Sequence, residues 1–243
     1  MRDTGRPLWA SQSTSTFRER CGDVSETMSD VSGLRSVYES AAYAPETAAK
    51  LESYVETELR GSGAYCFETN KALMKYYQCF PEKSNEDLLL GTLMLALMHL
   101  PAADYLAMAC IAPSTAYKGA GMLSVQALAD QLDQGKFGAF WGSFAAFKGK
   151  AYTPKNFETK VHAFILSSVQ KTFATVDKAQ LEGMLGLQGG DLEKMLTASP
   201  CVQDGSGSKV AMQVIAENQK STVKFDEGLS FEDVMKVLGN LAE

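Results

Sequence analysis

The 243-residue sequence has little of what most enzymes and metal-binding proteins need. It contains only two histidines, His99 and His162. Neither lies near a cysteine or an aspartate at a spacing that indicates a catalytic triad or a metal site. The glycine motifs, at 119–121 and from Gly205, lack the Walker spacing and the strand-turn-helix setting of nucleotide-binding loops. We therefore expect no catalytic residues, no cofactor and no metal site.

Positive charge is also scarce. The chain has 23 Lys and Arg against 29 Asp and Glu, a formal net charge of -6. Every arginine lies at or before Arg60. The field of the whole molecule does not attract polyanions, so nucleic acid is not the default partner.

Cysteine pairs, a secretory signal and a membrane segment are missing as well. The first residues, MRDTGRPLWASQ, contain no apolar run, so we expect no secretory signal. The longest apolar run, LLLGTLMLALMHL at 88–100, is shorter than the roughly 20 residues that span a bilayer and indicates a buried helix. No cysteine belongs to a CxxC pair, which is typical of free thiols in a reducing, cytoplasmic compartment. The cysteines are Cys21, Cys66, Cys79, Cys110 and Cys201.

Helical patterns dominate what is present. Residues 1–33 are rich in Ser, Thr and mixed charges and are expected to form a flexible N-terminal tail. From residue 34 to about 150, apolar residues recur at spacings of three and four between Pro and Gly stops. The pattern predicts an irregular HEAT-like stack of short helices that bury one another's faces.

The last predicted helix of this stack carries an aromatic stripe. An aromatic stripe can stack nucleic-acid bases, but such binding also needs a positive groove, and few basic residues lie nearby. We therefore interpret the stripe as core. It comprises Phe137, Phe140, Trp141, Phe144 and Phe147.

The pattern changes near residue 150. A long helix from Asn156 is followed by two short helices that meet at Gly189-Gly190, and then by strand-like pieces around 200–203 and 209–215. Helix, helix-turn-helix and a small β-wing make a winged helix, predicted at 151–225. Residues 226–243 close the chain with an amphipathic helix that Ser230 can cap. The predicted fold class is mainly α.

Two surfaces are candidates for partner binding. An exposed strand edge at 209–215 can pair with another subunit through main-chain hydrogen bonds. The apolar stripe of the terminal helix can lie in a bundle of partner helices, although it can equally fold back on its own domain. The side chains singled out are Val210, Met212, Val214, Phe231, Val234, Met235, Leu238 and Leu241.

The alternative function, from a different class, is nucleic-acid recognition by the winged helix. Proteins of this class place the second helix in the major groove and neutralise several phosphates. Residues 151–243 contain nine Lys, no Arg and twelve Asp and Glu, a net charge of -3. The second helix has Asp191 and Glu193 against Lys194. We therefore expect little direct nucleic-acid binding.

Several short motifs, taken in order, resemble a known family. An irregular helical stack followed by a winged helix is similar to the PCI architecture of large scaffolding complexes, and in detail to the subunit K family of eukaryotic translation initiation factor three. The resemblance covers roughly 43–226. Its motifs are YAPE (43–46), LESYVET (51–57), AYCFETNKALMKYYQ (64–78), LP with DY (100–105), FGAFW (137–141), FETKVHAFI (157–165) and VDKAQLEGMLG (176–186).

The resemblance implies a non-catalytic scaffold subunit. Its expected partners are other initiation factor three subunits, especially subunit L, and the small ribosomal subunit through the complex. A PCI subunit of the proteasome lid or the signalosome is the alternative within the same architecture.

Overall fold

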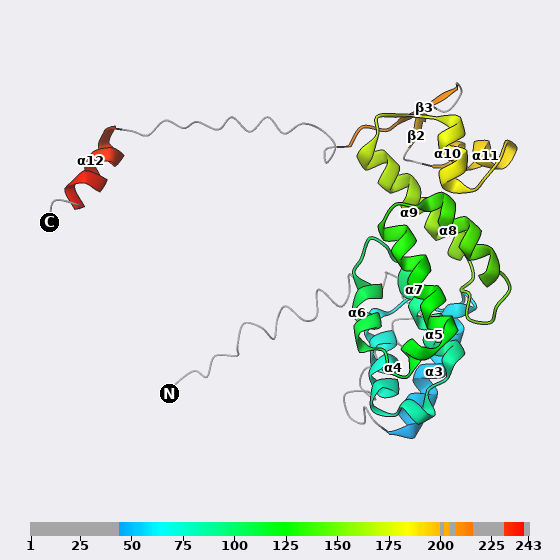
Figure 1. Ribbon diagram of the computed structural model, residues 1–243. Helices are drawn as coiled ribbons and strands as arrows, with labels where there is room; N and C mark the ends of the chain where they lie inside the picture. Colours follow the sequence, from blue (N-terminus) through cyan, green and yellow to red (C-terminus); the bar gives the residue numbers. More distant parts are fainter. Residues whose placement is uncertain (1–43, 200–201, 205–207, 216–230, 241–243) are drawn as a thin grey trace, which may run out of the picture. The chain divides into compact units, whose positions relative to one another are not determined.

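Figure 1 shows a computed structural model of the chain. The structure describes residues 44–199, 202–204, 208–215 and 231–240. The predicted tail at 1–33 and the first ten residues of the predicted stack lie outside the described residues. The described residues up to Gln213 belong to one compact unit, and those from Val214 onward belong to a second.

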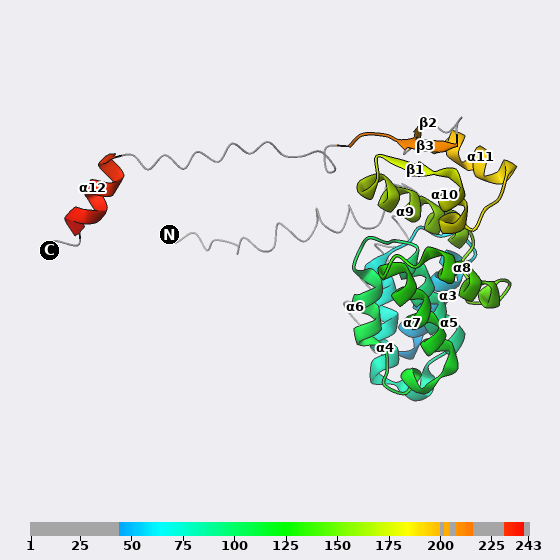
Figure 2. The ribbon, with the colours of Figure 1, turned by 45° about the horizontal axis from the view of Figure 1, so that its top comes forward.

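The first part of the compact unit is a stack of helices with short connections (Figures 1 and 2). Successive helices pack on one another: α3 contacts α4 and α5, α5 contacts α6 and α7, and α7 contacts α8. The α-helices are α3 (Pro45–Leu59), α4 (Phe67–Cys79), α5 (Glu86–Leu97), α6 (Asp104–Ile111), α7 (Ala120–Asp133) and α8 (Phe137–Phe144). The 3-10 turns are η2 (Pro81–Lys83), η3 (Ala116–Lys118) and η4 (Ala145–Phe147).

Helix α5 lies in the middle of the stack, and its residues from Leu88 to Leu97 are all buried. It starts where the Asn85 side chain accepts a hydrogen bond from the Asp87 amide, which satisfies one of the free N–H groups at a helix start. A Cβ at Gly91 would lie 2.8 Å from Leu59 Cδ1, so any other residue would require the Leu59 side chain to move. The interpretation of this apolar run as a buried helix is confirmed for residues 88–97.

The end of α5 corrects one predicted boundary. The sequence pattern continues to Pro101, but α5 ends at Leu97 and a turn leads to the Leu100–Pro101 peptide bond. The residue before a proline disfavours helical backbone, because the proline ring clashes with it. The helix therefore stops before the proline.

The aromatic stripe of α8 and η4 faces the core, as predicted. Phe140 is 0% exposed and Phe144 1%, and their rings stack with centroids 5.7 Å apart. Phe144 also stacks on Phe157, the first residue of α9, at 5.0 Å. One continuous set of buried residues thus runs from the stack into the following helices.

A winged helix follows, built from helices α9 (Phe157–Thr172), α10 (Lys178–Leu185) and α11 (Gly190–Ala198). Its strands are β1 (Thr175–Asp177), β2 (Val202–Asp204) and β3 (Lys209–Met212). They form one antiparallel sheet in the order β1-β3-β2. The mainly α fold class, with a helical stack, a winged helix and a C-terminal helix, is confirmed. That last helix, α12 (Phe231–Asn240), lies in the second unit.

Strand β1 is a third strand, in addition to the two strand-like pieces that the sequence pattern indicates. Asp177 ends β1 and is the N-cap of α10, and Val176 pairs with Val210 of β3. A three-residue strand is too short to show alternation, and its partner lies far along the chain. Only the folded sheet reveals it.

Candidate protein-binding surfaces

The helix-turn-helix is held against the stack at the C-terminal end of α10. The Trp141 indole Nε1 donates a hydrogen bond to the Met184 carbonyl oxygen at 2.9 Å. His162 Nε2 lies 3.0 Å from the Leu185 carbonyl oxygen, which can only accept, so Nε2 carries the hydrogen. These two side chains satisfy carbonyl groups that a helix end leaves without partners. The turn that follows is therefore fixed relative to α8 and α9.

Helix α11, which occupies the position of a DNA-reading helix, presents no excess positive charge. Lys194 pairs with Asp191 at 3.2 Å, and Lys178 of α10 pairs with Glu193 at 2.8 Å. The hydrogen bond and the charge of Lys178 lower the pKa of Glu193, so this carboxylate stays ionised. Phosphate binding needs an excess of cations, and on this face each lysine is matched by a carboxylate, so these four charges sum to zero.

The structure corrects the predicted strand edge at 209–215. Strand β3 is the central strand, paired with β1 on one side and β2 on the other, so its main chain offers no free edge. Val210 is 0% exposed and Met212 is 2% exposed. Both are therefore core residues. The sequence pattern alone could not show that a third strand closes the sheet. The outer strands of the sheet are β1 and β2.

Of the remaining predicted partner-binding side chains, those that the structure describes are exposed. Val214 is 64% exposed, and α12 exposes Phe231 at 78% and Met235 at 51%. Val234 and Leu238 of the same helix are also exposed, and Leu241 lies outside the described residues. Phe231, Val234, Met235 and Leu238 follow the three- and four-residue spacing of one helical face. We call these four residues the α12 stripe.

The two histidines occupy packed positions. His162 stacks on Trp141 with ring centroids 4.5 Å apart, and His99 stacks on Tyr65 at 3.7 Å. Burial lowers the pKa of both imidazoles, so both are neutral at physiological pH. Within the described ranges, no group of three or more His, Cys, Asp or Glu side chains is arranged to hold a metal ion.

Among the helices that the structure describes, none combines the length and apolarity of a membrane span. The described parts define a protein with a helical stack and a winged helix, in which the α12 stripe is an exposed apolar surface.

Comparison with known proteins identifies the family. The sequence model of the CSN8/PSMD8/EIF3K family matches residues 83–221, more than half of the chain, and the chain belongs to this family. It is 27% identical over 194 residues to eukaryotic translation initiation factor 3 subunit K of Drosophila sechellia, covering 79% of this chain and 86% of that protein. The mouse subunit K, from Mus musculus, is 28% identical over 202 residues, with 82% and 90% covered.

A third relative, which is also a subunit K, has a slightly higher sequence identity. Subunit K of Bombyx mori is 30% identical over 144 residues, which cover 59% of this chain and 66% of that protein. The resemblance to the subunit K family is thereby confirmed, and it supports a role as a translation initiation factor subunit.

Proposed function

We propose that this chain is a non-catalytic scaffold subunit of the eukaryotic initiation factor three complex and acts in the cytoplasm. The similarity to subunit K proteins over most of the chain supports the complex, and the α12 stripe supports the mode of binding. We further propose subunit L as a direct partner, and contact with the small ribosomal subunit through the assembled complex.

The α12 stripe is the observation that carries the proposed mode of binding. Four apolar side chains within one ten-residue helix are exposed, and burying each large one in a partner would contribute about 1.5–3 kcal/mol. Acidic Glu232 and Asp233 lie in the first turn of the same helix, where they favour its positive end. An amphipathic helix of this kind fits a groove or a bundle made by partner helices.

The outer strands of the winged helix are the second proposed contact. Pairing through β1 or β2 would extend the sheet through main-chain hydrogen bonds, which the central strand β3 cannot do. We also propose that the chain is divided at residues 150 and 225 into a helical stack, a winged helix and a terminal helix. In this proposal the stack is a spacer, the winged helix makes the pairwise contact, and the terminal helix joins the bundle.

Affinity purification of the tagged full-length chain tests the assembly role. We expect the other initiation factor three subunits, including subunit L, to co-purify in stable amounts. Replacing three residues of the α12 stripe with serine, at Phe231, Met235 and Leu238, should reduce their recovery at least tenfold. The matched control Glu232→Gln changes the same helix outside the stripe and should leave recovery unchanged.

Two outcomes would contradict this proposal. Full recovery with the triple serine variant would remove α12 from the interface, and an isolated chain in the extract would remove the assembly role. The alternative, a winged helix that reads nucleic acid, predicts tight and salt-dependent binding by the α11 face. The pairing of Lys178 and Lys194 with carboxylates argues against it.

A further inference from the structure

The loop between the stack and the winged helix has a charge opposite to the rest of the chain. No Asp or Glu occurs from 134 to 157, and residues 148–160 carry four lysines against Glu158, a net charge of +3. By contrast, residues 44–147 carry seven basic and eleven acidic side chains. The positive charge is therefore concentrated at one place in an acidic protein.

The lysines of this loop are exposed, and most of them have no carboxylate partner. Lys148, Lys150 and Lys155 of the loop are exposed, and so is Lys160 in the first turn of α9. Lys148 pairs with Glu158 at 2.8 Å, but the two side chains are 58% and 45% exposed, so this ion pair is weak. Within the described residues, no ion pair reaches the other three. We call Lys148, Lys150 and Lys155 the lysine ridge.

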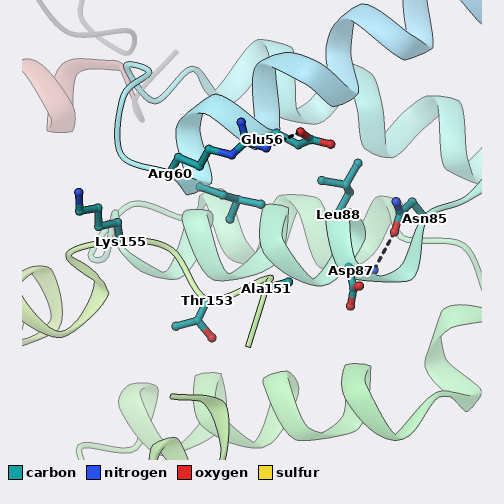
Figure 3. A pocket seen from close by; sticks show the side chains of 9 residues that line it. Glu56, Arg60, Asn85, Asp87, Leu88, Ala151, Thr153 and Lys155 are labelled. Carbon is teal, nitrogen blue, oxygen red and sulfur yellow. Dashed lines mark hydrogen bonds and ion pairs between the residues drawn. The ribbon is translucent and has the colours of Figure 1, made fainter. Parts of the chain in front are cut away.

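The ridge lies between two open pockets that share Thr153. One is lined by Lys148, Lys150 and Asn156, and the other by Lys155 together with Arg60 at the end of α3. Figure 3 shows the second pocket, in which Arg60 is paired with Glu56 at 3.0 Å and Lys155 lies away from Asp87. Both pockets therefore contain positive side chains, together with Glu158 in the first and Glu56 and Asp87 in the second.

The aromatic side chains of the loop are not available to a protein partner. Tyr152 and Phe157 are 7% and 1% exposed, and the Lys150 ammonium lies over the Phe147 and Tyr152 rings at 5.4 and 5.5 Å. The exposed charged side chains of the loop are its lysines. Protein interfaces are depleted in lysine and enriched in aromatic residues, whereas phosphate backbones are neutralised by exposed cations. The chemistry of the ridge fits phosphate better than protein.

We propose that the lysine ridge binds the phosphate backbone of RNA without reading its sequence. Lysine is a point charge and lacks the planar fork with which arginine recognises guanine, so base specificity is absent. The site is separate from α11, whose lysines are paired. It does not depend on the proposed assembly role: a chain that assembles normally but does not bind RNA would contradict this inference alone.

Fluorescence anisotropy with a short, labelled, mixed-sequence single-stranded RNA tests the proposal on the full chain. We expect weak binding at low salt that falls linearly on a log–log plot against salt concentration. Replacing Lys148, Lys150 and Lys155 with glutamine should weaken binding about tenfold or more and reduce the salt slope by about 2. Lys155→Gln alone, which breaks no contact of Lys148 or Lys150, should reduce the slope by about 0.7.

The matched control replaces three exposed lysines of the stack, Lys50, Lys83 and Lys118, with glutamine. It makes the same change of charge elsewhere and should keep the wild-type affinity. Equal loss in both triple variants, or no binding by the wild type at low salt, would overturn the proposal. Stronger binding of polyglutamate than of RNA would also overturn it, because the ridge would then be a site for acidic protein segments.

Discussion

The Trp141 indole donates its hydrogen bond to the carbonyl oxygen of Met184, at 2.9 Å, and this contact joins helix α8 of the stack to α10 of the winged helix. The indole ring also stacks on His162 of α9. One side chain thereby connects three consecutive α-helices. The orientation of the helix-turn-helix depends on it.

Trp141→Phe should destabilise the protein by about 1–2 kcal/mol. Phenylalanine keeps most of the aromatic packing but leaves the Met184 carbonyl oxygen without its donor, and an unsatisfied polar group in a packed site is costly. Urea unfolding followed by circular dichroism measures the change. If Trp141→Phe leaves the free energy of unfolding unchanged, a water molecule has replaced the indole N–H as the hydrogen-bond donor.

Gly186→Ala should destabilise the protein by about 2 kcal/mol or more. Gly186 has φ +64, and a Cβ there would lie 2.8 Å from Trp141 Cγ. Alanine disfavours this left-handed backbone and would also displace the indole. Gly183→Ala is the matched control in the same helix: a Cβ there meets nothing within 4 Å, and alanine should stabilise α10 by up to about 1 kcal/mol. If thermal unfolding shows the two variants to be equal, the geometry of this turn is wrong.

Glu58 should make stability fall as pH rises above its ordinary pKa. Burial raises the pKa of Glu58 from 4.5 to about 8, although bonds from the Asn70 amide and the Cys66 N–H oppose the shift. Between these two values the folded state binds more protons than the unfolded state, so the free energy of unfolding decreases with rising pH. This contribution is largest below pH 4.5 and is lost as pH rises toward 8.

Urea unfolding of the wild type and Glu58→Gln between pH 5 and 8 tests this expectation. The variant has no ionisable group at 58 and should lack the part of the pH dependence that Glu58 causes. His99 and His162 act in the opposite direction, because their lowered pKa values destabilise the fold as pH falls. The difference between the two proteins isolates Glu58, and parallel pH profiles would refute its assigned titration.

Val210→Asp should destabilise the winged helix by more than about 3 kcal/mol, whereas Val214→Asp should change stability by less than about 0.5 kcal/mol. Val210 is 0% exposed in the central strand, so a carboxylate there would be buried without a partner. Val214, two residues beyond β3, is 64% exposed. Similar losses of stability in the two variants would contradict the strand order.

Much of the helical architecture could be predicted from the sequence. Helical starts and stops are local signals: Pro45 begins α3, and Asn85 caps α5. The spacing of Phe140 and Phe144 places both on one face, and the structure buries both. These features depend on residues within a few positions of one another. Periodicity is therefore sufficient to read them.

The strand order and the availability of the candidate partner residues could not be predicted in this way. Whether Val210 lies in the core or on an edge depends on β1, whose Val176 pairs with it from far along the chain. The same holds for the lysine ridge, because only the fold brings Arg60, which follows α3, and Lys155 into the lining of one pocket. The sequence by itself determined the helices and their apolar faces, since these arise from local spacing. The tertiary structure decided which strand is central and which charges are neighbours, since those contacts form only when distant segments pack together.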